Sequence, residues 1–284
     1  MKIVRHGPSG EERPGVVDAH GTVRDLSGVM ADWTPRALAH DELRRIAALD
    51  LGDLPVVDPA VRLGIPVAAI GKFIAIGMNF VDFALDAGRP LPKEPTIFTK
   101  AISCLTGPTD TVVLPQGSTH TDWEVELGVV MGATARYAET RDALDLVAGY
   151  CLVNDLSERE FQNDRGGTWD KGKGCDTFGP VGPWLVTTDE VSDPQDVDLW
   201  LEVNGVRYQN GHTRNMIFPV AELIAYVSQF MTLNPGDILT TGSPAGIGST
   251  LKPAPVFLQA DDVMRLGSGK LGIQQHRVES WRRN

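Results

Sequence analysis

The sequence predicts an α+β fold that is mostly β, and three observations support this prediction. Short apolar or alternating segments, separated by Gly, Pro, Asn and Asp turns, recur between residues 73 and 241, which is typical of β-strands. One clear helix interrupts them at 220–231, where apolar residues keep the spacing of one helical face. A Pro- and Asp-rich segment at 53–59 is typical of a linker between two domains. We therefore expect a small N-terminal α/β domain at 1–65 and a larger domain at 66–284.

The small N-terminal domain is expected to contain a strand, a hairpin and a helix. Residues 2–5 form a short apolar strand, and residues 15–23 have the pattern of a hairpin. Thr34 suits the N-cap of a helix and Pro35 suits its first position, so a helix should run from there towards Leu49.

The larger domain is expected to consist of strands joined by tight turns. Asn204-Gly205 fits a two-residue hairpin turn, and a capping box from Ser157 to Glu160 predicts that a helix starts there. The strands that we expect are 73–76, 96–99, 111–114, 123–131, 148–154, 184–187, 199–203 with 206–209, and 237–241.

Composition and charge narrow the class of protein. Of the 284 residues, 42% are hydrophobic and 22% are charged, which is ordinary for a globular protein. The formal net charge of −11 disfavours nucleic acid and anionic membranes as partners. The first fifteen residues have no apolar core like that of a signal peptide. Three widely spaced cysteines (Cys104, Cys151, Cys175) suit a reducing compartment, so we expect a cytoplasmic protein.

The segment 121–130, TDWEVELGVV, alternates charged and apolar residues. Strict alternation is typical of a strand, so Asp122, Glu124 and Glu126 should share one face, with the two glutamates about 7 Å apart. Two interpretations of three like charges in a row stay open at this point. The carboxylates either form a solvated outer face or surround a cation.

A further carboxylate follows another expected strand. Residues 148–154 are apolar, and Asp155 falls at their end. Taken alone, Asp155 is best explained as assisting the start of the next helix, although a strand end is also where a ligand is delivered to a pocket. Together with Glu124 and Glu126 it would form an all-oxygen site for Mg²⁺, Mn²⁺ or Ca²⁺ rather than for zinc. The six histidines show no paired ligand spacing, which agrees with an all-oxygen site.

Two glycine-rich segments are candidates for ligand contact. Residues 167–173, GTWDKGK, match a phosphate-binding loop except that Gly174 replaces the final Ser or Thr, so we reject nucleotide binding. Lys171 and Lys173 remain there as cations that are either solvated or able to stabilise an anionic substrate. Residues 240–248, TTGSPAGIG, offer backbone N–H groups and hydroxyls, as anion-binding turns do.

Taken together, these stretches resemble the fumarylacetoacetate hydrolase family from about residue 73 to residue 278. The motifs that carry the resemblance are Asp122-Trp-Glu-Val-Glu126, Val153-Asn-Asp155, Gly167-Thr-Trp-Asp-Lys-Gly-Lys173 and Thr241-Gly-Ser-Pro-Ala-Gly-Ile-Gly248, in the expected order. The resemblance implies a rolled, mostly β catalytic domain, a small N-terminal domain and a homodimer.

The resemblance also implies a ligand set. It places a divalent metal, Mg²⁺ or else Mn²⁺ or Ca²⁺, on Glu124, Glu126 and Asp155. It places substrate contacts on Gln162, Lys173 and the turn of Thr241, Gly242 and Ser243, where Ser243 keeps the hydroxyl of a threonine that is usual in the family.

Family members cleave or rearrange 2-oxo acids, so the resemblance implies a small 2-oxo acid as substrate. We expect metal-dependent hydrolysis of a C–C bond in a 2,4-dioxo acid, either an acylpyruvate or a 2,4-dioxo-3-deoxy sugar acid, with release of pyruvate. The alternatives are decarboxylation of an oxaloacetate-type substrate, isomerisation, and a catalytically silent protein that binds a metal or a ligand.

One departure from the family pattern concerns a lid at residues 79–92. Hydrolytic members carry a histidine and a glutamate there that activate water, whereas this chain has Phe83 and Asp86 at those positions. Asp82, Asp86 or a metal-bound water then remains as the base, unless the reaction needs no activated water or activity has been lost. Because this segment has little periodic apolar pattern, we expect it to be mobile without ligand.

Overall fold

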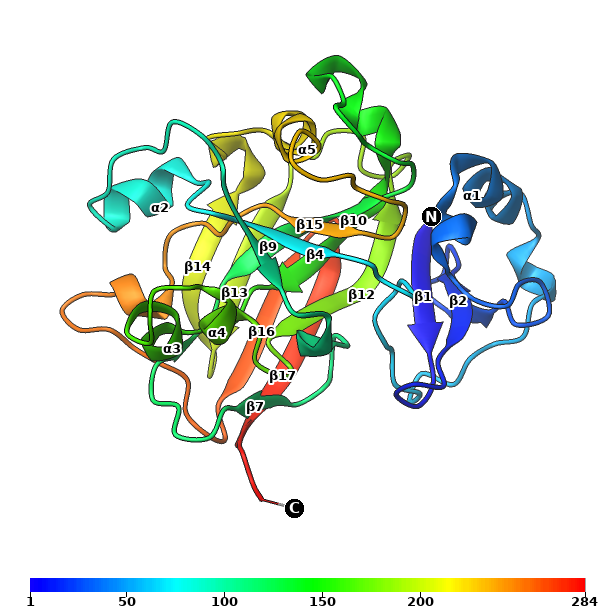
Figure 1. Ribbon diagram of the computed structural model, residues 1–284. Helices are drawn as coiled ribbons and strands as arrows, with labels where there is room; N and C mark the ends of the chain where they lie inside the picture. Colours follow the sequence, from blue (N-terminus) through cyan, green and yellow to red (C-terminus); the bar gives the residue numbers. More distant parts are fainter. Residues whose placement is uncertain (284) are drawn as a thin grey trace.

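The structure, a computed structural model that describes residues 1–283, confirms a mostly β, α+β fold built on two mixed sheets (Figure 1). The larger sheet has the strand order β3-β2-β1-β12-β10-β9-β15-β4-β5, with β6 paired beside β12. Its strands are β1 (Lys2–His6), β2 (Arg13–Val17), β3 (Val23–Asp25), β4 (Phe73–Gly77), β5 (Thr96–Lys100), β6 (Leu105–Thr106), β9 (Val125–Met131), β10 (Val147–Asn154), β12 (Gly179–Thr187) and β15 (Ile238–Thr240).

The second sheet packs against the first and closes the core. Its order is β14-β13-β16-β17-β7, and β16 and β17 contact β10 while β13 contacts β9. Side chains between the two sheets, such as Leu152, Leu201 and Leu266, are fully buried. The strands are β7 (Val112–Leu114), β13 (Asp198–Val203), β14 (Val206–His212), β16 (Val263–Ser268) and β17 (Gly272–Ser280), and a separate pair joins β8 (Thr121–Asp122) to β11 (Ser157–Glu158).

Short helices cover the edges of the sheets. In Figure 1, α2, α3 and α4 lie together at the left of the body and α5 lies at its top. No helix within residues 1–283 is long and apolar enough to cross a membrane. The helices are α1 (His40–Ala47), α2 (Val81–Asp86), α3 (Arg159–Asn163), α4 (Asp170–Lys173) and α5 (Val220–Val227), with 3₁₀ turns η1 (Pro35–Leu38), η2 (Leu51–Asp53), η3 (Ile102–Cys104), η4 (Thr140–Leu146), η5 (Thr213–Asn215) and η6 (Gly248–Thr250).

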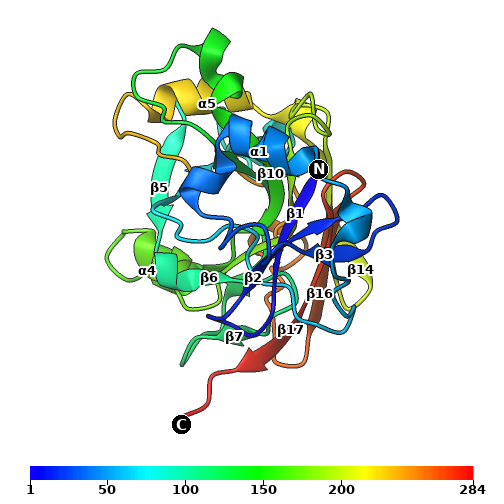
Figure 2. The ribbon, with the colours of Figure 1, turned by 90° about the vertical axis from the view of Figure 1, so that its right-hand side faces the viewer.

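The N-terminal strands continue the sheet of the body. β1 pairs antiparallel with β12 through Lys2–Val186 and Ile3–Leu185, and β2 and β3 extend the sheet beyond it. Figure 2 shows this part from its own side, with α1 beside β1. A division of the chain into domains at residue 65 stays a prediction.

The expected helix from Pro35 to Leu49 is wrong, because the chain breaks it at Ala39. Ala39 is extended between η1 and α1, and the side chain of Thr34 makes no capping hydrogen bond. In one continuous helix, Leu38 and Leu43 would point about 140° apart, since each residue turns the helix by about 100°. The break lets both side chains enter the core.

The structure also contains one hairpin that was not predicted, and it contradicts one further expectation. The C-terminal hairpin of β16 and β17 was not predicted, because its inward-facing positions include the polar residues Gln274 and His276, which hide the alternation. The capping box is also wrong: Ser157 belongs to β11, and the carboxylate of Glu158 instead accepts from the backbone N–H of Glu160.

Candidate metal centre

The acidic strand is buried on both faces. A short break at Trp123 and Glu124 separates β8 from β9, yet Asp122, Glu124 and Glu126 are at most 8% exposed. A solvated outer face is therefore excluded. Asp122 has a structural role, because it accepts hydrogen bonds from Arg159 and from the backbone N–H of Gly248 and so connects these two segments.

Antiparallel pairing brings Asp155 to the two glutamates. β10 pairs with β9 so that Val153 faces Glu126 and Asn154 faces Val125, and the backbone N–H of Asp155 then donates to the carbonyl of Glu124 at 2.9 Å. One carboxylate oxygen from each of Glu124, Glu126 and Asp155 lies within 4.8 Å of the others. This oxygen-only donor set suits Mg²⁺, Mn²⁺ or Ca²⁺.

Three buried or half-buried cations face these carboxylates. The ammonium of Lys173 lies 2.7 Å from Glu124 Oε2 and 2.6 Å from Asp155 Oδ2. Lys100 Nζ lies 2.6 Å from Asp155 Oδ1, and Arg159 pairs with both Asp122 and Glu124. Burial raises the pKa of Asp155, but the charges of Lys100 and Lys173 outweigh it and hold this pKa below its ordinary value.

Glu126 is the carboxylate without a cationic partner among the described residues. Within residues 1–283, its carboxylate accepts one hydrogen bond, from the backbone N–H of Gly242 at 2.8 Å. Burial, reinforced by the charges of Asp155 and Glu124, raises the pKa of Glu126 well above its ordinary range. When Glu126 is ionised, four carboxylates, including Asp122, meet three cations, and the cluster has one negative charge in excess. The residues present therefore fit a divalent cation placed beside Glu126.

The position of Lys173 depends on the glycine before it. A Cβ on Gly172 would lie 2.4 Å from the carbonyl oxygen of Glu158, so only glycine lets α4 approach α3 this closely. Lys173 is 2% exposed as a result, whereas the ammonium of Lys171 contacts the carbonyl of Arg165 at the surface. Burial lowers the pKa of Lys173, but Asp155 and Glu124 outweigh burial and raise this pKa above its ordinary value, so the side chain stays charged.

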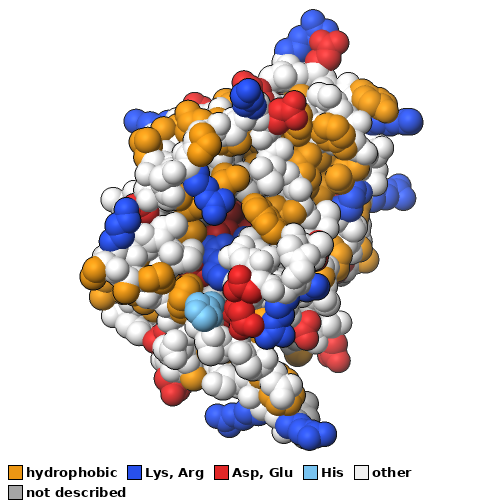
Figure 3. Space-filling model, turned by 60° about the vertical axis from the view of Figure 1, so that its left-hand side comes forward, with side chains coloured by type: hydrophobic (Ala, Val, Ile, Leu, Met, Phe, Trp, Pro, Cys, Tyr) orange, Lys and Arg blue, Asp and Glu red, His pale blue; other side chains and the backbone are white. Residues whose placement is uncertain are grey.

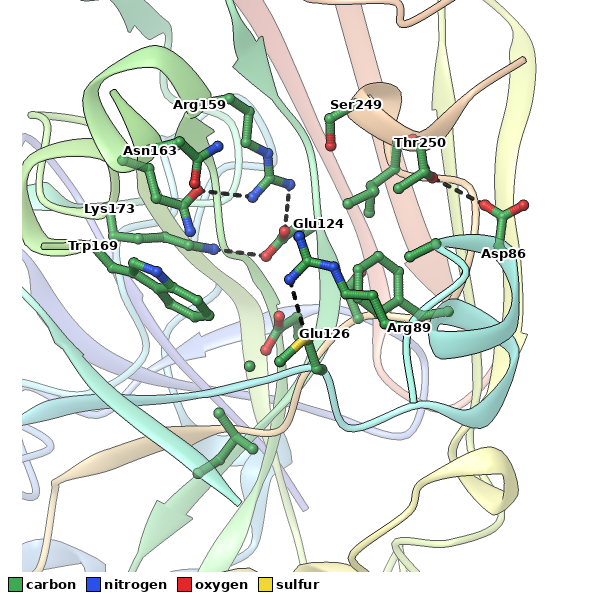
Figure 4. Close-up of a pocket in the computed structure, with 18 of the residues that line it drawn as sticks. Asp86, Arg89, Glu124, Glu126, Arg159, Asn163, Trp169, Lys173, Ser249 and Thr250 are labelled. Atoms are coloured by element: carbon green, nitrogen blue, oxygen red, sulfur yellow. Dashed lines mark hydrogen bonds and ion pairs between the residues drawn. The ribbon is translucent and has the colours of Figure 1, made fainter. Parts of the chain in front are cut away.

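Glu124 and Glu126 line a cavity of about 550 Å³, whereas Asp155 lies behind them and is not part of its lining. Figure 4 shows two facing walls: one from α3 and α4 with Arg159, Trp169 and Lys173, and one from the lid and η6 with Arg89 and Thr250. Figure 3 shows the mouth of this hollow, with Lys and Arg side chains around it.

The predicted substrate residues are divided between the cavity and the structure behind it. Gln162 and Ser243 line the cavity, and Ser243 Oγ donates to the carbonyl of Val125 at 3.0 Å. Thr241 does not line it, because its buried hydroxyl donates to the carbonyl of Leu127. Gly242 touches the site through its N–H to Glu126, and its φ of +89° suits glycine.

The lid contains the short helix α2, and its start is anchored by Asn79. The buried amide of Asn79 donates to the carbonyls of Phe218 and Thr241 and accepts from the N–H of Phe218. Phe83 and Asp86 line the cavity, whereas Asp82 does not and instead accepts from the backbone N–H of Phe83. Mobility of the lid stays a prediction.

Several contributors to the site were missed in the sequence. Lys100 and Arg159 are counter-ions of the carboxylates, and Trp169 lines the cavity with its ring against Phe98 at 5.0 Å between centroids. Arg159 follows the SerGlu pair of β11 and could have been noted as a cation close to Asp155. Lys100 carries no such signal, because it is simply the last residue of a strand.

A second acidic group fits a metal less well. His120, Glu158 and Glu160 also present ligand atoms within 4.8 Å of one another, but His120 is exposed. Glu158 is already engaged as an acceptor from Thr121 and from the N–H groups of His120 and Glu160. This group is explained as the N-terminal cap of α3.

Comparison with known proteins gives a consistent family match. The domain described as "Fumarylacetoacetate (FAA) hydrolase C-terminal" matches residues 72–279. A protein of Burkholderia ambifaria with the provisional name of hydrolase is 57% identical over 274 residues, which cover 96% of this chain and 97% of that protein.

Solved structures resemble the whole chain. Maleylpyruvate hydrolase from Sphingobium sp. SYK-6, in complex with manganese(II) and pyruvate, is 31% identical with a TM-score of 0.82, covering 99% of this chain and 100% of that one. A Mycobacterium abscessus protein described as a probable 2-hydroxyhepta-2,4-diene-1,7-dioate isomerase is 32% identical with a TM-score of 0.83, covering 100% of both chains. The fold expected from the resemblance is thereby confirmed.

The raised pKa of Glu126 predicts how metal-free stability depends on pH. A carboxyl group whose folded pKa exceeds its unfolded value stabilises the fold below the unfolded pKa, and this contribution is lost as the pH rises through the folded pKa. The Glu126→Gln variant has no ionisable group at this position, so it does not lose stability as the pH rises through that pKa. In EDTA, the Tm of Glu126→Gln minus that of wild type should therefore increase from about pH 5 to about pH 8.

The same variant tests metal binding. Adding Mn²⁺ at the higher pH should raise the Tm of the wild type and have much less effect on Glu126→Gln. Glu160→Gln is the matched control, and it should respond to Mn²⁺ like the wild type. A metal effect that is lost in Glu160→Gln and kept in Glu126→Gln would place the ion at the other acidic group.

Proposed function

The chain belongs to the fumarylacetoacetate hydrolase family, and from this premise we propose that it hydrolyses a C–C bond in a small 2,4-dioxo acid and releases pyruvate. The proposed substrate is an acylpyruvate or a 2,4-dioxo-3-deoxy sugar acid, and the proposed cofactor is Mg²⁺ or Mn²⁺ held by Glu124, Glu126 and Asp155. The observation that carries the proposal is the convergence of these three buried carboxylates beside the charged Lys173, where Glu124, Glu126 and Lys173 line one cavity.

The proposed reaction consumes one water. Water adds to the 4-oxo carbon, the C3–C4 bond breaks, the acyl part leaves as a carboxylic acid, and C3 takes up a proton to give pyruvate. A divalent cation, when bound, supplies Lewis-acid stabilisation of the negative charge that develops on the 2-oxo acid.

The chain's own residues orient and neutralise the substrate. An ammonium has three protons, and Lys173 directs two of them to the carboxylates of Glu124 and Asp155. The third has only a long contact, 3.4 Å, to the backbone carbonyl of Asp155, and a substrate oxygen can replace that contact. Gln162 and the hydroxyl of Ser243 line the same space and provide neutral polar contacts. Phe98 and Trp169 supply an apolar wall, which restricts water around the reacting atoms.

Asp86 is the better of the two aspartates proposed as the general base. It lines the cavity, whereas Asp82 lies outside the lining. Asp86 Oδ2 accepts from Thr250 Oγ1 at 3.0 Å, which leaves its second oxygen able to take a proton from water.

A second candidate function is favoured by Phe83. Its ring lines the cavity on the lid side and cannot accept a proton. Decarboxylation of an oxaloacetate-type acid, or isomerisation of a 2-oxo acid, needs the stabilised enolate and no activated water. The structural relative described as an isomerase belongs to this second class.

A turnover screen decides between these functions. The purified protein is incubated with Mg²⁺ or Mn²⁺ and with oxaloacetate, fumarylpyruvate, maleylpyruvate or 2,4-dioxo-3-deoxy sugar acids, and EDTA is the control. We expect release of pyruvate from a 2,4-dioxo acid that depends on the added metal. Pyruvate from oxaloacetate alone would favour the decarboxylase, and no turnover of any substrate would leave a silent binding protein.

Assembly and location stay predictions from the sequence. We propose a homodimer in the cytoplasm, with no nucleic acid and no membrane as partner. Size-exclusion chromatography with light scattering measures the assembly directly.

Lys173→Ala should reduce turnover by at least about 100-fold, because it removes a positive charge beside the reacting atoms. Its affinity for Mn²⁺ should be kept, since the carboxylates lose a competing cation. Lys171→Ala, at the surface, is the control and should turn over substrate like the wild type. The assignment fails if Lys171→Ala is inactive and Lys173→Ala is active.

Phe83→His should raise hydrolysis of an acylpyruvate about tenfold or more relative to decarboxylation of oxaloacetate, because it restores a general base. Both rates are measured on the same protein preparation with the same metal, and Phe161→His, outside the cavity lining, is the control. An unchanged ratio, together with fast hydrolysis by the wild type, would show that another residue is the base, and Asp86→Asn would then be the next variant.

A further inference from the structure

We propose that Phe98 is a positioning residue for Lys173, and that the face of its ring helps to hold the ammonium where it meets the substrate. The inference rests on the proposed function, in which Lys173 contacts an oxygen of the 2-oxo acid. Both side chains line the cavity, but Phe98 belongs to β5 and Lys173 is the last residue of α4.

The ammonium of Lys173 contacts two carboxylates and an aromatic ring. Two of its protons are directed to Glu124 and Asp155, at 2.7 and 2.6 Å. The nitrogen also lies over the ring of Phe98, 5.1 Å from the ring centroid. The face of an aromatic ring carries partial negative charge, so it attracts an ammonium. This attraction comes from the wall of the cavity, whereas the carboxylates belong to the metal centre.

The strand β5 holds Lys173 at two points. Phe98 and Lys100 share one face of β5, because side chains two residues apart point to the same side of a strand. The ammonium of Lys100 donates to the backbone carbonyl of Lys173 at 2.6 Å. Lys100 therefore fixes the backbone of Lys173, and Phe98 contacts the end of its side chain.

Trp169 supports the ring of Phe98. The two ring centroids are 5.0 Å apart and the ring planes are inclined by 67°, which is an edge-to-face contact. The carbonyl of Trp169 also accepts from the N–H of Lys173 at 3.0 Å, and Figure 4 shows both side chains on one wall of the cavity. A Cβ on Gly77 would lie 2.7 Å from the indole, so glycine lets this ring pack against β4.

The placement of the ammonium matters because one of its protons remains for the substrate. That proton has only the contact of 3.4 Å to the carbonyl of Asp155. The stem of a lysine is flexible, so a further contact at the ammonium narrows the positions that this proton can take. A weaker attraction to the ring should then place the proton less well and weaken the binding of a 2-oxo acid.

Fluorinated phenylalanines at position 98 separate this effect of charge from packing, because each fluorine withdraws electron density from the ring and changes its shape little. The full chain is produced with phenylalanine or with its mono-, di- or trifluorinated form at this position. Calorimetry on the Mn²⁺-loaded protein gives the Kd for pyruvate, and thermal unfolding in EDTA gives the Tm. The Kd should rise with each fluorine, by about threefold or more over the series, and the Tm should fall in the same order.

Phe161 is the matched control. The guanidinium of Arg165 lies over its ring, 4.3 Å from the centroid, and the ring is outside the cavity lining. The same fluorinated series at position 161 should leave the Kd for pyruvate unchanged. Phe98→Leu, which has no ring face, should bind pyruvate at least as weakly as the trifluorinated protein.

A Kd or a Tm that stays constant along the series at Phe98 overturns the proposal, even if Phe98→Leu binds pyruvate weakly, because the ring would then only fill space. A wild type that does not bind pyruvate overturns it as well. Failure of the turnover screen together with a Kd that rises along the series would instead reject the proposed function and retain the role of Phe98.

Discussion

The burial of four carboxylates at one end of β9 and β10 is the constraint on which the rest of the site depends. Buried carboxylates repel one another and lose hydration, so each needs a cation or donated hydrogen bonds. Arg159, Lys100 and Lys173 meet that need for Asp122, Glu124 and Asp155. The arrangement explains why α3 and α4 pack so closely to the acidic strand and why the segment before Lys173 requires glycine. Glu126 is left with a single backbone donor, which marks where another positive charge fits.

Local pattern predicted the fold class, most of the strands and the acidic cluster. The carboxylates of residues 121–130 could be identified because alternation is visible in adjacent residues and requires no knowledge of tertiary contacts. The C-terminal hairpin was missed because Gln274 turns inward to donate to the carbonyls of Leu152 and Gly182, so a polar residue stands where the pattern needs an apolar one. Lys100 was missed for a different reason: its partner is 55 residues away, and nothing in either segment indicates the pairing.

The two walls of the cavity differ in how their charges are paired. The wall of α3 and α4 holds charges that are already neutralised and is tied to the sheet by buried ion pairs. The cations of the lid wall are not neutralised in this way. Asn79 anchors the lid to the backbone carbonyls of Phe218 and Thr241. Phe83 belongs to the lid wall, so a substitution there is expected to leave the three carboxylates in place.

We propose that Glu124, Glu126 and Asp155 hold one divalent cation. The most direct measurement is anomalous X-ray diffraction from crystals of this protein grown with Mn²⁺. One strong anomalous peak is expected within about 2.0–2.6 Å of a carboxylate oxygen from each of the three residues, the range for hard divalent cations. A peak at His120, Glu158 and Glu160, or no peak between the three carboxylates at saturating Mn²⁺, would contradict it.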